Sequence, residues 1–290
     1  HVNLALLNVL VKIENDRISF FGTDMNITSI SYTEDANISE EGEFCFPAKE
    51  FYNIITALPN DIIDVVVDKE IIIIKCLDSI YKLRGMSADI YPDIPSVDFE
   101  YSISLNGAVL WRMFNKLLVS ASSDPMDEAL AALYIEIDGS KISGYGADVF
   151  KMGWFEYTLE EDKNVQEKFV LARSTVNILL KILDNASDDE IQISKERNQV
   201  AFKYRNMTIL STLLNFDFAD MSSLRRDTEA KILVDTKEFI EKSQRALILS
   251  DNSSHSVFLK LDKNMMEIFS ENSDLGMARE FLNIDYAKDS

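Results

Sequence analysis

The stretches FPAKEFYNIITAL (residues 46–58) and LARSTVNILLKIL (residues 171–183) decide the fold, because they are two copies of one pattern. In the first copy, apolar residues fall at i, i+3, i+4 and i+7 from Phe51, which is the spacing of one face of an amphipathic helix. In the second copy the same spacing starts at Val176, 125 residues later. The pair predicts two equivalent helices in an internal repeat.

The sequence around these two helices repeats as well. Each helix follows a short apolar strand and precedes an acidic turn and three further strands. The strands are predicted at 62–67, 71–76 and 79–83 after the first helix, and at 190–193, 199–204 and 207–213 after the second. The repeating unit is therefore a strand, a helix and a group of antiparallel strands.

A second repeated element is a hairpin of two alternating strands with one buried face. It occurs at residues 9–24, 132–148 and 257–272. Helices are predicted before the second and third hairpins, at 106–119 and 235–249. Asp235 and Glu238 have the spacing of an N-cap and its partner at the start of the latter helix.

The order of these elements predicts an α+β fold of repeated domains, each with two helices packed on antiparallel sheet. We place the domains at residues 1–99, 100–227 and 228–290, with boundaries in polar, loop-like segments. On this division the first domain lacks its N-terminal helix and the third contains only its first half. The sequence therefore has the appearance of a chain truncated at both ends.

The charge of the chain is distributed unevenly between the predicted helices and the rest. The whole chain carries a net charge of -20, which argues against extensive phosphate binding. Helix 106–119 contains two basic residues and no acidic one, as does helix 172–183, while helices 47–58 and 235–250 are neutral. The four helices thus carry +4 and the remainder −24. If the helices share a surface, that surface can face phosphates while the exterior repels them.

No catalytic or metal-binding constellation is visible in the sequence. The only histidines are His1 and His255, and acidic clusters fall in turns, where solvation explains them. Cys45 and Cys76 lie in apolar, strand-like runs, which predicts buried reduced thiols. No apolar run reaches the length of a membrane span. We therefore expect a non-enzymatic cytoplasmic protein with no cofactor, metal or membrane partner.

Three segments carry a resemblance to a known family. They are GTDMNI (residues 22–27), FPAKEFYNIITALPND (46–61) and YKLRGMSADIYPDIP (81–95). In order and spacing they resemble the first domain of the bacterial DNA polymerase III β subunit, the sliding clamp, and the similarity continues through the second domain into the third. The resemblance implies the DNA clamp fold. It also implies a homodimeric ring, lined by helices, that encircles duplex DNA independently of sequence and tethers DNA polymerase and clamp loader subunits through short peptide motifs.

The resemblance and the helix charges together predict the residues that face DNA. Similarity places Lys49 and Arg173 at lining positions that are basic in the family, and the charge count adds the other basic residues of the two positive helices. The predicted DNA-facing residues are Lys49, Arg112, Lys116, Arg173 and Lys181. In the family a loop of the second domain touches DNA, but here the corresponding loop, residues 123–129, is acidic.

The resemblance further implies a pocket between the second and third domains that receives a peptide with apolar anchors. We call it the partner-peptide pocket, and its predicted wall is Leu130, Ala147, Val149, Phe150, Lys151, Met152, Ala219, Ser223 and Leu224. Its residues depart from the family pattern, since Val149 and Phe150 replace a small residue and a histidine, Ala219 replaces a proline and Ser223 an arginine. The pocket stays apolar, as peptide anchors require.

The predicted protomer interface pairs the first domain with the third, with Tyr81 and Leu83 meeting Ile248 and Leu249. An alternative function is a diverged clamp-like module that recruits partners without encircling DNA, which the acidic loop and the altered pocket favour.

Overall fold

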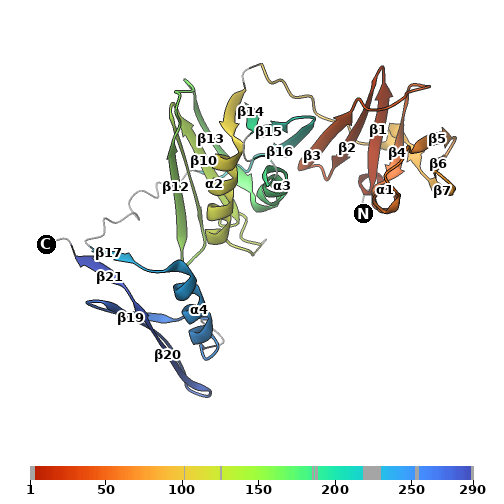
Figure 1. Ribbon diagram of the computed structural model, residues 1–290. Helices are drawn as coiled ribbons and strands as arrows, with labels where there is room; N and C mark the ends of the chain where they lie inside the picture. Colours follow the sequence, from red (N-terminus) through yellow and green to blue (C-terminus); the bar gives the residue numbers. More distant parts are fainter. Residues whose placement is uncertain are drawn as a thin grey trace. The chain divides into compact units, whose positions relative to one another are not determined.

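The structure is a computed structural model that describes residues 4–100, 102–124, 126–184, 186, 189–217, 230–251 and 255–288 (Figure 1). The chain forms two compact units, residues 1–218 and 219–290. We describe each unit by itself.

The described residues of the first half of unit 1 contain one α-helix, whose apolar stripe packs on strands of two sheets. Helix α1 (Ala48–Ala57) and the residue after it pack half-buried apolar side chains against a core that includes the buried Ile72 and Ile74. These side chains are Phe51, Ile54, Ile55 and Leu58. The other elements are a 3-10 helix (Leu4–Leu7), β1 (Asn8–Glu14), β2 (Arg17–Thr23), β3 (Ile27–Thr33), β4 (Gly42–Pro47), β5 (Asp64–Asp68), β6 (Ile71–Cys76), β7 (Ser79–Arg84), β8 (Met86–Ser87) and a 3-10 turn (Ala88–Ile90).

The second half of unit 1 holds two α-helices in one core. Helices α2 (Gly107–Ser120) and α3 (Arg173–Leu183) pack against each other, and Phe114, Leu117, Val176 and Leu179 are at most 2% exposed. The strands are β9 (Ile103–Asn106), β10 (Ala132–Asp138), β11 (Lys141–Ala147), β12 (Met152–Thr158), β13 (Gln166–Ala172), β14 (Glu190–Glu196), β15 (Gln199–Tyr204) and β16 (Met207–Thr212).

The two halves of unit 1 share one nine-stranded antiparallel sheet, in the order β8-β4-β1-β2-β3-β16-β15-β14-β9. The junction is the pairing of β3 with β16, in which Ser31 lies opposite Met207 and Ile27 opposite Ser211. The Thr212 amide continues the ladder by donating to the Asn26 carbonyl at 2.9 Å. Closing the edges of β3 and β16 against each other satisfies backbone groups that would otherwise form an exposed sheet edge.

The remaining sheet of the second half, β12-β11-β10-β13, carries α2 on one face. Gly146 and Gly153 allow this close approach, because a Cβ on Gly146 would lie 2.7 Å from the Leu117 carbonyl oxygen and one on Gly153 would lie 2.5 Å from the Ser120 hydroxyl. Asn106 caps α2 by accepting hydrogen bonds from the Ala108 and Val109 amides.

The described residues of unit 2 contain one α-helix, α4 (Thr236–Leu247), packed on β19 (Met265–Asn272) and β20 (Gly276–Asn283). Asp235 caps the helix by accepting from the Glu238 amide at 2.8 Å, which confirms the predicted N-cap, while the Glu238 carboxylate accepts from Lys242. Met266, Ile268 and Leu282 form the buried centre of this unit. Its other strands are β17 (Ala230–Leu233), β18 (Phe258–Asp262) and β21 (Asp285–Lys288).

The α+β fold class, with helices on antiparallel sheets, is confirmed. The four helices lie within two or three residues of their predicted bounds. Cys45 and Cys76 are both buried and free, and burial, with a smaller contribution from Glu43, raises the pKa of the Cys45 thiol to about 11. In the described part of the chain, no helix is long and apolar enough to cross a membrane.

Candidate functional sites

The exposed face of α2 carries two of the predicted DNA-facing residues. Arg112 and Lys116 are exposed and four residues apart, so they lie in one row on the face opposite the buried stripe. Asn115 is exposed on the same face. The predicted Lys181 is exposed on α3, along with Ser174 and Asn177.

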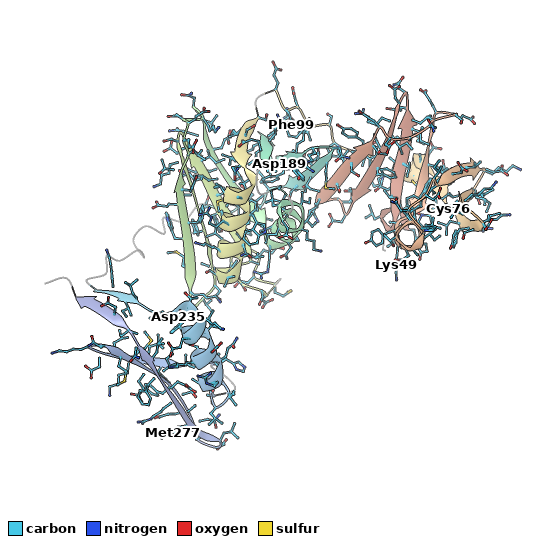
Figure 2. The ribbon with its side chains drawn as sticks, viewed as in Figure 1. Lys49, Cys76, Phe99, Asp189, Asp235 and Met277 are labelled. Carbon is cyan, nitrogen blue, oxygen red and sulfur yellow. The ribbon has the colours of Figure 1, made fainter. Side chains whose placement is uncertain are left out.

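Helices α2 and α3 pack side by side and bury their apolar stripes in the same core. Their outward stripes therefore face the same side of the second half of unit 1, and Arg112, Lys116 and Lys181 belong to one surface. Lys49 is exposed on α1 in the first half and projects outward from the helix (Figure 2).

The cations on these helices differ from those on the sheets in their partners. Within the described ranges, Lys49, Arg112, Lys116 and Lys181 form no ion pair. On the sheets of the second half, in contrast, several cations are neutralised at short range by acidic residues of other strands: Lys141 by Glu156 at 2.7 Å, Lys168 by Glu136 at 2.8 Å and Lys195 by Glu167 at 2.6 Å. The helix face therefore keeps uncompensated positive charge, whereas much of the charge on these sheets is cancelled locally.

Arg173, the fifth predicted DNA-facing residue, has a different environment. It is half-buried, and its Nη1 donates to the carbonyl oxygens of Leu118, Ala121 and Ser122 at 3.0, 3.1 and 3.1 Å. These carbonyls end α2, whose last turn contains no basic residue. Arg173 thus stabilises the end of the neighbouring helix. Contact of its other donor atoms with DNA stays a prediction.

The acidic loop of the second domain begins at the end of α2. Asp124 accepts a hydrogen bond from the Met126 amide at 2.9 Å, which fixes a tight turn. Asp124 and Glu128 are exposed and Asp127 is half-buried. Among the described residues none of these three carboxylates has a cationic partner within ion-pair distance. The loop therefore presents negative charge, which is unfavourable beside phosphate.

The part of the predicted partner-peptide pocket that the structure describes lies at the ends of β10, β11 and β12. Ala147 ends β11 and is buried, while Leu130 and Met152 are half-buried. Val149 and Phe150 are 74% and 94% exposed in the turn between β11 and β12. Ala219, Ser223 and Leu224 lie outside the described residues.

The charge of Lys151 is used within its own turn. Its Nζ lies 2.6 Å from Asp148 Oδ2, and this hydrogen bond, with two from backbone amides, lowers the pKa of Asp148 to about 2. Lys151 therefore contributes little free positive charge to the predicted pocket.

The predicted protomer-interface residues occupy two different settings. Tyr81 and Leu83 lie in β7, where Tyr81 is exposed and Leu83 packs against the Ile72 and Ile74 core. Ile248 and Leu249 follow α4 in unit 2, with Ile248 73% exposed. Their pairing across two protomers stays a prediction.

The described residues contain no group of three or more His, Cys, Asp or Glu side chains able to hold a metal ion. His255 is exposed.

Two family profiles match most of the chain. "DNA polymerase III beta subunit, N-terminal domain" matches residues 2–95, and "DNA polymerase III beta subunit, central domain" matches residues 104–220. Among relatives, the chain is 25% identical over 284 residues to the beta sliding clamp of Haemophilus influenzae, covering 97% of the chain and 77% of the relative. It is 24% identical over 292 residues to that of Bacillus subtilis, with the same shares covered.

Solved structures have the same fold. The DNA polymerase III subunit beta of Pseudomonas aeruginosa superposes with a TM-score of 0.89 at 21% identity, covering 97% of this chain and 78% of that one. The Bacillus subtilis DNA polymerase sliding clamp gives 0.88 at 22% identity, with 98% and 78% covered. The fold is therefore that of a sliding clamp, a class of non-catalytic processivity factors. The chain belongs to the DNA polymerase III beta subunit family, as its sequence motifs predicted.

Sequence reasoning missed the contacts of Arg173. The helix it serves has no C-terminal glycine or basic residue, which is a weak signal that another element must satisfy its last carbonyls. It also missed Val119 and Met126, which are 72% and 89% exposed in α2 and the acidic loop.

Proposed function

We propose that this protein is a replication processivity factor that encircles duplex DNA as a homodimeric ring and tethers the replicative polymerase and other proteins to it. The family to which the chain belongs supports this function. The observation that carries it is positive charge on the helices of a chain whose net charge is -20: in the part of the chain that the structure describes, Lys49, Arg112, Lys116 and Lys181 form no ion pair.

A ring that slides has to hold DNA weakly and without reading bases. Phosphate contacts are strong in sum and depend on the number of cations, so a few exposed cations suit sliding better than a dense basic patch. Exposed neutral side chains between them, such as Asn115 and Asn177, can hydrogen-bond to water around the phosphates. The ring then stays on DNA because it is closed around it, and the acidic remainder of the chain limits binding of DNA to other surfaces.

The finer assignments belong to the same proposal. The chain divides into clamp domains at residues 1–99, 100–227 and 228–290, and two protomers meet through Tyr81 and Leu83 on one side and Ile248 and Leu249 on the other. Partner proteins, including polymerase and clamp loader subunits, bind by short peptides at the partner-peptide pocket, and the protein acts in the cytoplasm. Two solved clamps, from Pseudomonas aeruginosa and Bartonella birtlesii, are described as bound to griselimycin, which supports a ligand site in this fold.

The experiment that tests the proposal is retention on closed DNA. The gene product is loaded by its own clamp loader onto nicked circular plasmid and gel-filtered before and after the plasmid is linearised. Co-elution that disappears on linearisation is the expected result, because only a topological link is released by cutting.

A second candidate function is a clamp-like module that recruits partners without encircling DNA. The acidic loop with Asp124 and Glu128 favours it, as does the use of Arg173 inside the protein. Failure of folded protein to co-elute with circles, with an active loader, would overturn the ring and favour this module.

A further inference from the structure

One residue, Arg173, holds both ends of the acidic loop (residues 123–129). Before the loop, its Nη1 donates to the Ser122 carbonyl oxygen at 3.1 Å, and after the loop its backbone amide donates to the Ala131 carbonyl oxygen, also at 3.1 Å. The Ser122 amide in turn donates to the Leu130 carbonyl oxygen at 2.8 Å, so the two ends of the loop are bonded to each other as well. The first residue of α3 therefore closes the base of the loop.

The guanidinium of Arg173 also fixes this base to α2. The nitrogen that binds Ser122 lies 3.0 and 3.1 Å from the carbonyl oxygens of Leu118 and Ala121, in the last turn of the helix and just after it. Carbonyls at a helix end have no partner within the helix, and a half-buried cation that binds several of them stabilises all of them together. The loop therefore has a defined position relative to the C-terminal end of α2.

Hydrogen bonds inside the loop order its carboxylates. Asp124 accepts from the Met126 amide through Oδ1 at 2.9 Å and from the Asp127 amide through its carbonyl oxygen at 3.2 Å. The Asp127 carbonyl oxygen accepts from the Ala131 amide at 2.8 Å. Asp124 and Glu128 are exposed, and neither has a cation within ion-pair distance in the described part of the chain. The loop thus holds two negative charges in place without neutralising them.

These charges lie next to the exposed cations of α2. Lys116 and Arg112 are four and eight residues before Ser120, the last residue of the helix, which is about 6 and 12 Å along the helix axis. At about 0.1 M salt, charges act on each other over roughly 10 Å before ions screen them. Negative charge at the end of α2 therefore opposes the approach of a phosphate to Lys116, and to a smaller extent to Arg112.

We propose that Arg173 is a positioning residue, which holds the acidic loop beside the cations of α2 so that Asp124 and Glu128 weaken the grip of the protein on DNA. On this proposal Arg173 acts through the loop and does not itself bind phosphate. The inference rests on the proposed function, in which duplex DNA lies against the helices. It gives the acidic loop a task that a sliding ring needs, which is to keep its affinity for DNA low.

The first test neutralises the loop. Asp124→Asn with Glu128→Gln keeps the hydrogen-bond acceptor of the turn and removes two charges, and we call this the loop variant. Binding of the full chain to a short linear DNA duplex is measured by fluorescence anisotropy. Affinity is expected to rise about fivefold at about 0.05 M salt, the size of a few screened charge contacts, and to stay unchanged at about 0.5 M.

The matched control for the loop variant is Glu160→Gln with Glu196→Gln. It changes the net charge equally at exposed sites elsewhere in unit 1 and should keep the affinity for the duplex within about twofold. Equal gains in the two double variants, or no gain in the loop variant, overturn the inference.

Hydrogen exchange tests the hold of Arg173 on the loop without DNA. Arg173→Gln should speed exchange of the Ser122 and Ala131 amides by about tenfold, because the base of the loop then opens at a lower free energy. Amides of α1, in the other half of unit 1, should be unaffected. Arg173→Lys, whose ammonium group has three donors, should restore slow exchange. Unchanged exchange of Ser122 and Ala131 in Arg173→Gln overturns the positioning role.

Combining the two changes asks whether Arg173 acts on DNA through the loop. In an Arg173→Gln background the loop variant should gain less than about twofold in affinity, because the loop is no longer held beside α2. A phosphate contact by Arg173 would instead give an equal loss in both backgrounds and flatten the slope of log affinity against log salt by about 0.9, as Lys116→Gln should do. That result, or the full gain in the Arg173→Gln background, overturns the inference.

Retention on nicked circular plasmid distinguishes this inference from the proposed function. If the parent protein stays on circles and the loop variant binds the duplex no more tightly, the ring stands and the inference fails. If the parent leaves the circles while the loop variant gains affinity for the duplex in a way that depends on Arg173, the ring fails and the inference stands. If neither protein binds the duplex at any salt concentration, the inference fails whatever the circles show.

Discussion

Helices α1 and α3 have the same apolar stripe 125 residues apart, yet they are buried to different extents. In α3, Val176, Leu179 and Leu183 are at most 3% exposed, whereas α1 has no buried residue at all. The difference comes from neighbours, because α2 packs beside α3, while α1 packs mainly on the strands β1, β4 and β7 of its own half. A helical stripe therefore specifies which face turns inward, and the adjoining elements set how much free energy its burial contributes.

The largest expected effect tests this comparison directly. Leu179→Ala removes a side chain that is 2% exposed and should destabilise the second half of unit 1 by about 2–5 kcal/mol. The equivalent Ile54→Ala should cost less, about 1–2 kcal/mol, because Ile54 is only half-buried. Hydrogen exchange at α1 and α3 gives the opening free energy of each helix in both variants. Equal losses of opening free energy in the two variants would contradict the claim that packing beside α2 makes the stripe of α3 contribute more.

A second contrast is between the two basic residues of α3. Arg173→Ala should destabilise by about 1–3 kcal/mol, because three carbonyls at the end of α2 lose a donor. Lys181→Ala should change stability by less than about 0.5 kcal/mol, because Lys181 is exposed and forms no ion pair in the described structure. Chemical denaturation followed by the fluorescence of Trp111 and Trp154 measures both. The opposite ranking would sink the assignment of Arg173 to the end of α2.

A third, smaller effect concerns how the helices begin. Helix α2 has a side-chain cap, Asn106, whereas α1 and α3 have none. Asn106→Ala should cost about 1 kcal/mol. Asn115→Ala, the same change in the exposed middle of α2, serves as the control and should be neutral or slightly stabilising, because Ala is the better helix former. A similar shift of the denaturation midpoint for the two variants would show that the hydrogen bonds of Asn106 contribute nothing to stability.

The smallest effect is the pH response of the Asp148 turn. The pKa of Asp148 is lowered in the folded state from 3.8 to about 2, chiefly by its hydrogen bond with Lys151. A carboxyl with a depressed pKa stabilises the fold above its unfolded pKa and loses that contribution as pH falls through the folded value. The Phe150 amide should therefore stay protected from exchange as pH falls through 3.8 and lose protection near 2. Loss already centred at 3.8 would contradict the turn geometry.

The fold could be predicted from the sequence because the patterns that specify it are local and repeated. The stripe from Val176, the capping pair of Asp235 and Glu238, and the alternating hairpins each depend on residues a few positions apart. Colinear motifs then identified the family, which the matched profiles confirm.

What sequence could not supply is set by long-range geometry. The β3–β16 junction joins residues about 180 positions apart, and no local pattern specifies it. Likewise, the sequence gives Arg112 and Lys195 the same charge, and only the structure distinguishes the unpaired helix cation from the one neutralised by Glu167. The DNA-facing, pocket and interface roles inferred from the resemblance stay predictions.

The most direct test of the account is to ask which face of the loaded protein lies next to DNA. A photo-crosslinking amino acid is placed at Asn115 or Asn177 on the helix face, and at Lys141 or Glu156 on the sheet of the same half. After loading onto nicked circles, irradiation should link DNA to the two helix positions and not to the two sheet positions. Crosslinks from the sheet positions, or equal crosslinking from all four, would contradict the claim that the helices line the passage for DNA.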